Sequence, residues 1–121
     1  MSRVLLVDDE APIRRALASV LRGHGHEVRT ASNGIEAISS LQDAPADVVV
    51  ADVNMPDMDG IELLIALQEA APEVPVVVMS GGGLFDKALL LDSAAALGAV
   101  RTLEKPFEPE ELLEAIDGVT G

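Results

Sequence analysis

Three apolar runs of this chain each end in side chains suited to metal or phosphoryl chemistry. The first run leads to Asp8 and Asp9, and the second leads to Asp52. The third leads to Ser80, and a fourth candidate strand leads to Lys105. If these runs are parallel strands of one sheet, their carboxyl ends lie along one edge and the side chains converge there. The pattern predicts a magnesium and phosphoryl-transfer site.

The chemistry of such a site follows from its groups. Magnesium prefers oxygen ligands, usually one or two carboxylates with waters and a phosphate. Without a cation, three neighbouring carboxylates would repel one another. One carboxylate can then attack a phosphoryl group to form an acyl phosphate, while a lysine ammonium and a serine hydroxyl donate to the remaining phosphoryl oxygens.

Composition limits the class of protein. The chain has 121 residues, 49% of them hydrophobic, and we expect residues 1–121 to form one domain with its own core and no output domain. The formal net charge of -13 predicts no binding to nucleic acid or to anionic membrane surfaces. The chain has no cysteine, no signal-peptide pattern and no apolar run long enough to span a membrane. We therefore expect a cytoplasmic protein.

Candidate strands and helices alternate along the chain. Short, valine-rich runs predict five strands, at residues 3–7, 27–31, 47–51, 75–79 and 99–103. Segments with helical spacing predict five helices, at residues 11–23, 33–42, 59–71, 86–97 and 108–118. Alternation with short connections predicts an α/β fold, in which a parallel sheet carries helices on both faces.

The first two helices have apolar stripes that predict which side faces the sheet. In the first helix, which Gly23 or Gly25 would end, the stripe consists of Ile13, Ala16, Leu17, Val20 and Leu21. In the second helix, it consists of Ile35, Ala37, Ile38 and Leu41.

Taken together, four motifs resemble the receiver domain of bacterial two-component response regulators, and chemotaxis receivers in particular. They occur in the family's order and with similar spacing over essentially the whole chain, where any one alone would be a weak signal. The motifs are Leu-Val-Asp-Asp-Glu, Asp52-Val-Asn-Met-Pro-Asp-Met-Asp-Gly60, Met79-Ser80-Gly81 and Glu104-Lys105-Pro106-Phe107. The resemblance implies a flavodoxin-like fold with a five-stranded sheet of order 2-1-3-4-5, the order known for the chemotaxis receiver.

The resemblance also implies a metal site and a phosphoacceptor. Asp52 would accept the phosphoryl group from a histidine kinase or a histidine phosphotransfer protein, with a downstream protein as the second partner. Magnesium would be bound directly by Asp9, Asp52 and the carbonyl of Asn54, and through water by Asp8. Such a domain catalyses only its own phosphorylation and slow dephosphorylation.

For the phosphoryl group itself, the resemblance implies contacts from Ser80 and Lys105. In the family the peptide after the lysine is typically cis, which Pro106 permits at a small free-energy penalty. Relatives usually carry tyrosine or phenylalanine at the position of Thr102, so the aromatic rotamer switch is absent here. Three glycines, Gly81 to Gly83, make the following loop unusually free, and we hypothesise that phosphorylation orders it.

Two other functions remain open. A receiver-like binding module that acts without phosphate is favoured by Thr102. A magnesium phosphohydrolase of the haloacid dehalogenase type would also use a strand-end aspartate, but it expects a second aspartate where this chain has Asn54.

Several other motifs favour ordinary structural roles. A calcium-loop interpretation starting at Asp52 fails, because its sixth position is Asp57 rather than glycine. His24 and His26 are expected to lie in a turn between a helix and a strand rather than in a metal or phosphotransfer site. Met79 is expected to pack in the core or a loop, and Phe107 is expected to pack below the turn at Lys105 and Pro106.

Overall fold

Five parallel strands form one sheet in the computed structural model, which describes residues 2–52, 60–81, 99–105 and 107–120. The strands are β1 (Arg3–Val7), β2 (Glu27–Ala31), β3 (Val48–Asp52), β4 (Val76–Gly81) and β5 (Ala99–Lys105). Their order across the sheet is β2-β1-β3-β4-β5, which confirms the expected topology. The last three strands extend one or two residues further than predicted, so that Asp52 belongs to β3 itself.

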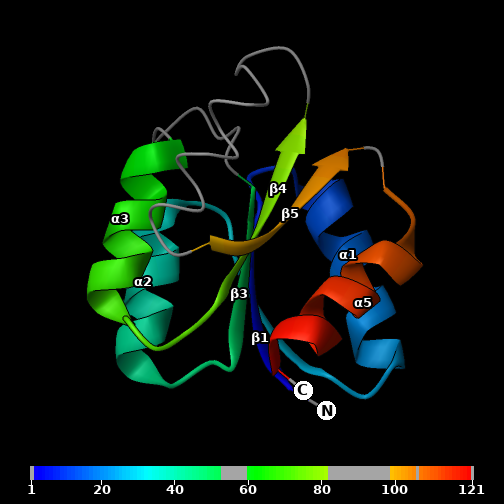
Figure 1. Ribbon diagram of the computed structural model, residues 1–121, viewed down its shortest axis with the longest axis horizontal. Coiled ribbons are helices and arrows are strands. Elements are labelled where there is room, and N and C mark those ends of the chain that lie inside the picture. Colours follow the sequence, from blue (N-terminus) through cyan, green and yellow to red (C-terminus); the bar gives the residue numbers. More distant parts are fainter. Residues whose placement is uncertain (1, 53–59, 82–98, 106, 121) are drawn as a thin grey trace.

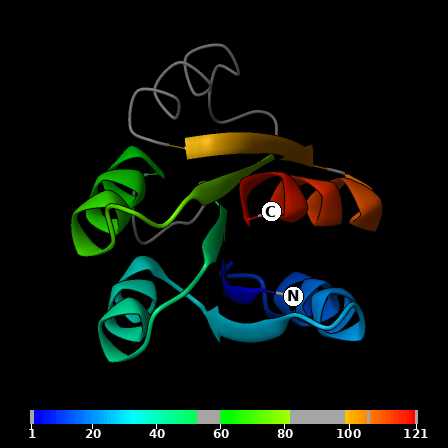
Figure 2. The same ribbon diagram turned by 60° about the horizontal axis from the view of Figure 1, so that its bottom comes forward.

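Helices cover both faces of the sheet, as the alternation predicted (Figure 1). The described helices are α1 (Ala11–Gly23), α2 (Gly34–Asp43), α3 (Gly60–Ala70) and α5 (Pro109–Thr120). One face is covered by α2 and α3 and the other by α1 and α5, a separation that is also visible in Figure 2. The helix predicted at residues 86–97 lies outside the described residues. None of the described helices is long and apolar enough to cross a bilayer.

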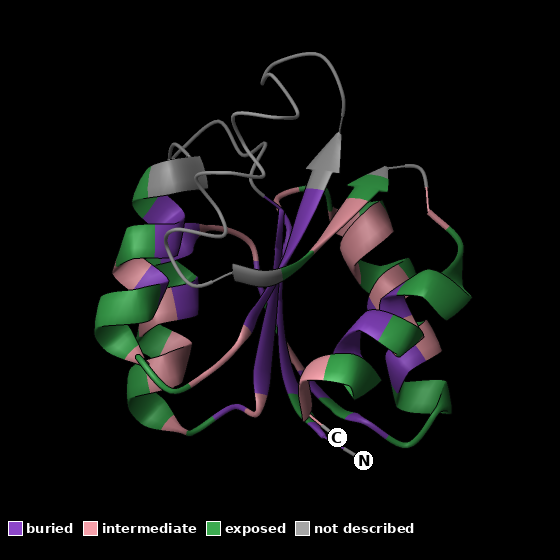
Figure 3. Cartoon of the chain, in the orientation of Figure 1, coloured by how far each residue is buried: buried purple, intermediate pink, exposed green. Residues whose placement is uncertain are grey.

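Two apolar layers hold the helices against the sheet, because successive side chains of a strand point to opposite faces. Leu5 and Val49 pack with α3 residues such as Leu64, whereas Leu6 and Val50 pack on the side of α1 and α5. Figure 3 shows β1, β3 and β4 buried along most of their length, as expected for inner strands covered by helices on both faces. Met79 is fully buried in the second layer, which confirms its predicted packing in the core. Phe107 is half-buried and packs against the same layer. Its predicted place below the turn at Lys105 and Pro106 involves residue 106, which lies outside the described residues.

The end of α1 explains the glycine-rich turn that follows it. The backbone N–H of His26 donates to the carbonyl of Leu21 and that of Gly25 to the carbonyl of Arg22, the pair of bonds that defines a Schellman motif. Gly25 has φ 88°, a left-handed conformation that a glycine adopts without a steric penalty. The helix itself ends at Gly23.

The predicted stripe of α1 is wrong at Ala16. This residue is exposed, and Ala18 is buried instead, beside the buried Leu21. The face of α1 that packs on the sheet is therefore centred closer to Ala18 than the apolar stripe predicted. Two alanines of equal hydrophobicity two positions apart could not show which of them faces the sheet.

Side-chain hydrogen bonds cap the start of α2. The Asn33 side chain accepts from the Glu36 backbone N–H at 2.8 Å, and the Glu36 carboxylate accepts from the Ser32 hydroxyl at 2.6 Å and from its N–H at 3.2 Å. These bonds from Ser32 lower the pKa of Glu36. Ile35 was wrongly predicted to face the core and is 77% exposed, because it lies on the opposite side of the helix from the buried Ala37.

Candidate metal and phosphoryl-transfer site

The two central strands bring Asp8 and Asp52 side by side. In the register of the sheet, Val7 of β1 pairs with Ala51 of β3. Asp8 directly follows Val7, the last residue of β1, and Asp52 follows Ala51 as the last residue of β3. The Asp8 backbone N–H donates to the Ala31 carbonyl at 3.1 Å and so continues the pairing of β1 with β2. Both carboxylates therefore lie at the carboxyl edge of the sheet.

Four carboxylates gather at this edge. One oxygen from each of Asp8, Asp9, Glu10 and Asp52 can be chosen so that all lie within 4.8 Å of one another. Asp8 and Asp52 are buried, Asp9 is half-buried and Glu10 is exposed. Like charges at this separation repel strongly where water is excluded, and a hard cation with oxygen ligands relieves that repulsion. The donor set therefore fits a magnesium-type ion, and the group could hold one.

The carboxylates of Asp8, Asp9 and Asp52 were all singled out by the sequence, whereas Glu10 was not. Glu10 directly follows the acidic pair and is the residue that precedes the first turn of α1. Its position immediately after two candidate ligands was the signal that could have identified it.

Hydrogen bonds fix the turn that carries three of these acids. The Glu10 backbone N–H donates to Oδ1 of Asp8 at 2.9 Å, and the Arg14 guanidinium donates to the Asp8 backbone carbonyl at 2.8 Å. Arg14 lies in the first turns of α1, so the helix holds the turn that precedes it. The Asp8 carboxylate is thus oriented by the backbone rather than left to rotate.

The backbone positions of Ser80 and Lys105 lie at the same edge. Asp52 pairs with Met79, and the following pairs are Ser80 with Glu104 and Gly81 with Lys105. The side chains of Ser80 and Lys105 fall outside the described part of the structure, as do Asn54, Pro106 and the glycines at 82 and 83. The roles assigned to these residues remain predictions.

Thr102 is half-buried and pairs with Val78 across β4 and β5. It occupies the position at which the family resemblance implies an aromatic ring. A threonine side chain is too short to swing between two distant environments as a ring does, so the structure offers no aromatic switch at this point of β5.

The two histidines lie at the other edge of the sheet, in the turn between α1 and β2, as predicted. His26 is buried, and its Nδ1 accepts from the Ser2 backbone N–H at 3.1 Å. Nδ1 of His24 lies 3.0 Å from the Val20 carbonyl. Both rings are engaged with the backbone, which agrees with a structural role.

Comparison with known proteins agrees with this geometry. Residues 4–117 match the family model described as the response regulator receiver domain. The chain is 43% identical, over 88% of its length, to protein-glutamate methylesterase/protein-glutamine glutaminase 3 of Rhodospirillum rubrum, but it spans only 28% of that protein. It is 34% identical to the chemotaxis protein CheY of Thermotoga maritima, with 98% of this chain and 97% of that protein covered.

A solved structure is also similar over nearly the full length. The chemotaxis protein CheY4 of Vibrio cholerae superposes with a TM-score of 0.89 at 36% identity, and 98% of each chain is covered. Both the fold and the motifs of this chain therefore agree with the same family.

Proposed function

Because this chain belongs to the response regulator receiver domain family, we propose that it accepts a phosphoryl group on Asp52 and thereby changes its affinity for a downstream protein. Receiver domains are signal transducers rather than classical enzymes, and they interact with histidine kinases and with effectors. The proposed donor is the phosphohistidine of a histidine kinase or of a histidine phosphotransfer protein. We further propose that residues 1–121 act as one cytoplasmic receiver domain.

One observation carries the proposal. The Asp52 carboxylate ends a fully buried strand and stands among three further carboxylates, in a chain that matches the receiver family almost throughout. A cation held by these carboxylates would also neutralise part of the further negative charge that an incoming phosphoryl group brings to Asp52.

The transfer can be written with every bond accounted for. A carboxylate oxygen of Asp52 attacks phosphorus, the phosphorus–nitrogen bond of the donor breaks, and its electron pair returns to the imidazole. When the other ring nitrogen of the donor carries a proton, the donor histidine leaves as neutral imidazole and Asp52 carries an acyl phosphate. The signal ends by slow hydrolysis of the acyl phosphate. Water attacks phosphorus, inorganic phosphate leaves and the Asp52 carboxylate is restored.

Magnesium is the proposed cofactor, and when bound it would neutralise negative charge on the phosphoryl oxygens. We propose that Asp9, Asp52 and the Asn54 carbonyl bind it directly and that Asp8 does so through water. The backbone N–H of Glu10 keeps the Asp8 carboxylate in one orientation for that role. Ser80 and Lys105 are the proposed donors to the other phosphoryl oxygens.

Phosphorylation is further proposed to order the loop that begins at Gly81. This predicts that amides of residues 81–85 exchange faster with solvent in the free protein and become protected on activation. Equal exchange rates in both states would refute the loop hypothesis but would not bear on the proposal that Asp52 is the phosphoacceptor.

Intact mass provides the test of the proposed function. Wild type, Asp52→Asn and Asp47→Asn are each incubated with acetyl phosphate, with and without magnesium. We expect one phosphoryl adduct on wild type and on Asp47→Asn, only with magnesium, and none on Asp52→Asn. Asp47 is the matched control because it is also a strand-associated aspartate but lies at the other edge of the sheet.

A phosphate-independent binding module is the second candidate, and Thr102 favours it. A folded wild-type protein that forms no adduct under any of these conditions would support this module and contradict the phosphoacceptor proposal. Turnover of small phosphate esters would instead support the phosphohydrolase.

A further inference from the structure

A pocket of about 280 Å³ lies between the carboxyl ends of α2 and α3, at the edge of the sheet opposite Asp52. Its lining comes from the end of α2, the loop into β3, the end of α3 and the loop into β4. The volume is small for a cofactor site, since such pockets usually hold about 300–1,000 Å³, and it suits one long side chain.

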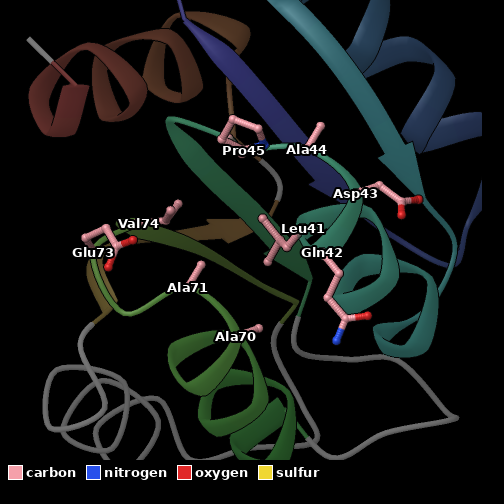
Figure 4. A pocket seen from close by; sticks show the side chains of 10 residues that line it. Leu41, Gln42, Asp43, Ala44, Pro45, Ala70, Ala71, Glu73 and Val74 are labelled. Carbon is pink, nitrogen blue, oxygen red and sulfur yellow. The ribbon is translucent and has the colours of Figure 1, made fainter.

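The lining combines an apolar floor with acidic flanks. Leu41, Ala71 and Val74 lie between Asp43 on one side and Glu73 on the other (Figure 4). The three apolar residues are half-buried, whereas both acids are exposed. An occupant with an apolar stem and a positive charge would complement both parts of this lining.

The backbone adds to the negative potential of the pocket. Helices α2 and α3 both end here, and the last carbonyls of a helix carry partial negative charge. Neither helix has a basic residue in its last turn. Residues 30–86 contain no lysine or arginine at all, so neither α2 nor α3 supplies a cation to this face.

The chain itself shows which side chain such a helix end binds. From β2, the Arg29 guanidinium donates to the carbonyls of Ser40, Ala44 and Pro45, at 3.4, 3.0 and 3.3 Å. Ala44 and Pro45 also line the pocket, and Arg29 lines a separate hollow on their other side. Arginine suits this environment because its planar guanidinium offers several donors and its stem packs on apolar surface.

We propose that this pocket is a docking site for an arginine side chain of a basic protein partner. The arginine stem would pack on Leu41, Ala71 and Val74, and its guanidinium would lie between the acidic flanks and the carbonyls that end α3. A second copy of this chain is a poor occupant, since the net charge of -13 makes two copies repel each other.

The probe is the capped peptide acetyl-Gly-Arg-Leu-Gly-amide, titrated into the uniformly ¹⁵N-labelled protein at low ionic strength. Its control is the same peptide with citrulline, which keeps the shape of arginine without the charge. We expect saturable amide shifts confined to residues 41–46 and 70–74 with the arginine peptide only. The Asp43→Asn/Glu73→Gln variant should weaken binding at least threefold.

Glu114→Gln/Asp117→Asn is the matched control variant, because it removes two exposed acids from α5 on the other face of the sheet. It should bind the peptide as wild type does, and so should Asp52→Asn, which separates this inference from the proposed function. Shifts scattered over all acidic surfaces, equal weakening in both double variants, or concentration-dependent dimerisation through the pocket would overturn the proposal.

Discussion

Aspartates lie at both edges of the sheet, but in opposite electrostatic surroundings. At the carboxyl edge, Asp8 and Asp52 are buried among other carboxylates. At the amino edge, Asp47 accepts from the Arg3 backbone N–H at 2.7 Å and from the Arg3 guanidinium at 3.1 and 3.3 Å. The Asp47 side chain is 38% exposed and forms an ion pair with Arg3.

This difference in surroundings distinguishes Asp47, which has a structural role, from the carboxylates proposed to function at the other edge. Hydrogen bonds from the Arg3 side chain and backbone lower the pKa of Asp47, so its charge stabilises the fold. At the carboxyl edge, four carboxylates of like charge lie close together, and a bound cation would relieve their repulsion.

The largest expected effect of this difference is stabilisation by magnesium. At a magnesium concentration a hundred times its Kd, the free energy of unfolding of wild type should rise by about 2.7 kcal/mol, because the ion binds only the folded cluster. Asp47→Asn should keep this response and Asp9→Asn/Asp52→Asn should lose it, as measured by thermal unfolding. A response that survives in the double variant would place the ion elsewhere.

Removing one charge from each edge should change stability in opposite directions. Without divalent ions, Asp9→Asn should raise the free energy of unfolding by about 1 kcal/mol, because repulsions with three neighbouring carboxylates disappear. Asp47→Asn should lower it by about 1 kcal/mol, because hydrogen bonds and an ion pair with Arg3 are weakened. Denaturant unfolding in EDTA measures both. Changes of the same sign would contradict the contrast between the edges.

The smallest effect concerns acid unfolding. The pKa of Asp47 is lower in the folded than in the unfolded chain, so its contribution is complete above the ordinary value of 3.8 and is lost as pH falls below it. The stabilising contribution of Glu36 is likewise lost as pH falls below its ordinary pKa of 4.5, because hydrogen bonds from Ser32 lower its pKa in the folded chain. Asp47→Asn should therefore flatten the dependence of stability on pH between about 4 and 3. An unchanged slope would show that the pair with Arg3 is too weak to matter.

The sequence was sufficient to predict the sheet and its carboxyl edge because strand-length apolar runs and their polar ends are strong local signals. It predicted the convergence of Asp8, Asp9 and Asp52 for the same reason, since parallel strands align their ends. It did not predict Glu10, because a third acid in a row is ordinarily a solvated helix start.

The remaining errors arose where local pattern does not determine orientation. Ala16 and Ala18 are equally apolar, and only packing against the sheet decides which one is buried. Ile35 is apolar yet exposed, because it lies on the opposite side of α2 from the buried Ala37. The pocket between α2 and α3 depends on two helix ends meeting in space, which no single segment of sequence encodes.

Mapping the phosphoryl group tests the central claim most directly. After incubation with acetyl phosphate and magnesium, borohydride reduces an aspartyl phosphate to homoserine, and peptide mass spectrometry shows which residue was converted. The account predicts homoserine at position 52 alone, in wild type and in Asp47→Asn. Homoserine at Asp8 or Asp9 instead, or no converted residue in a folded protein, would contradict it.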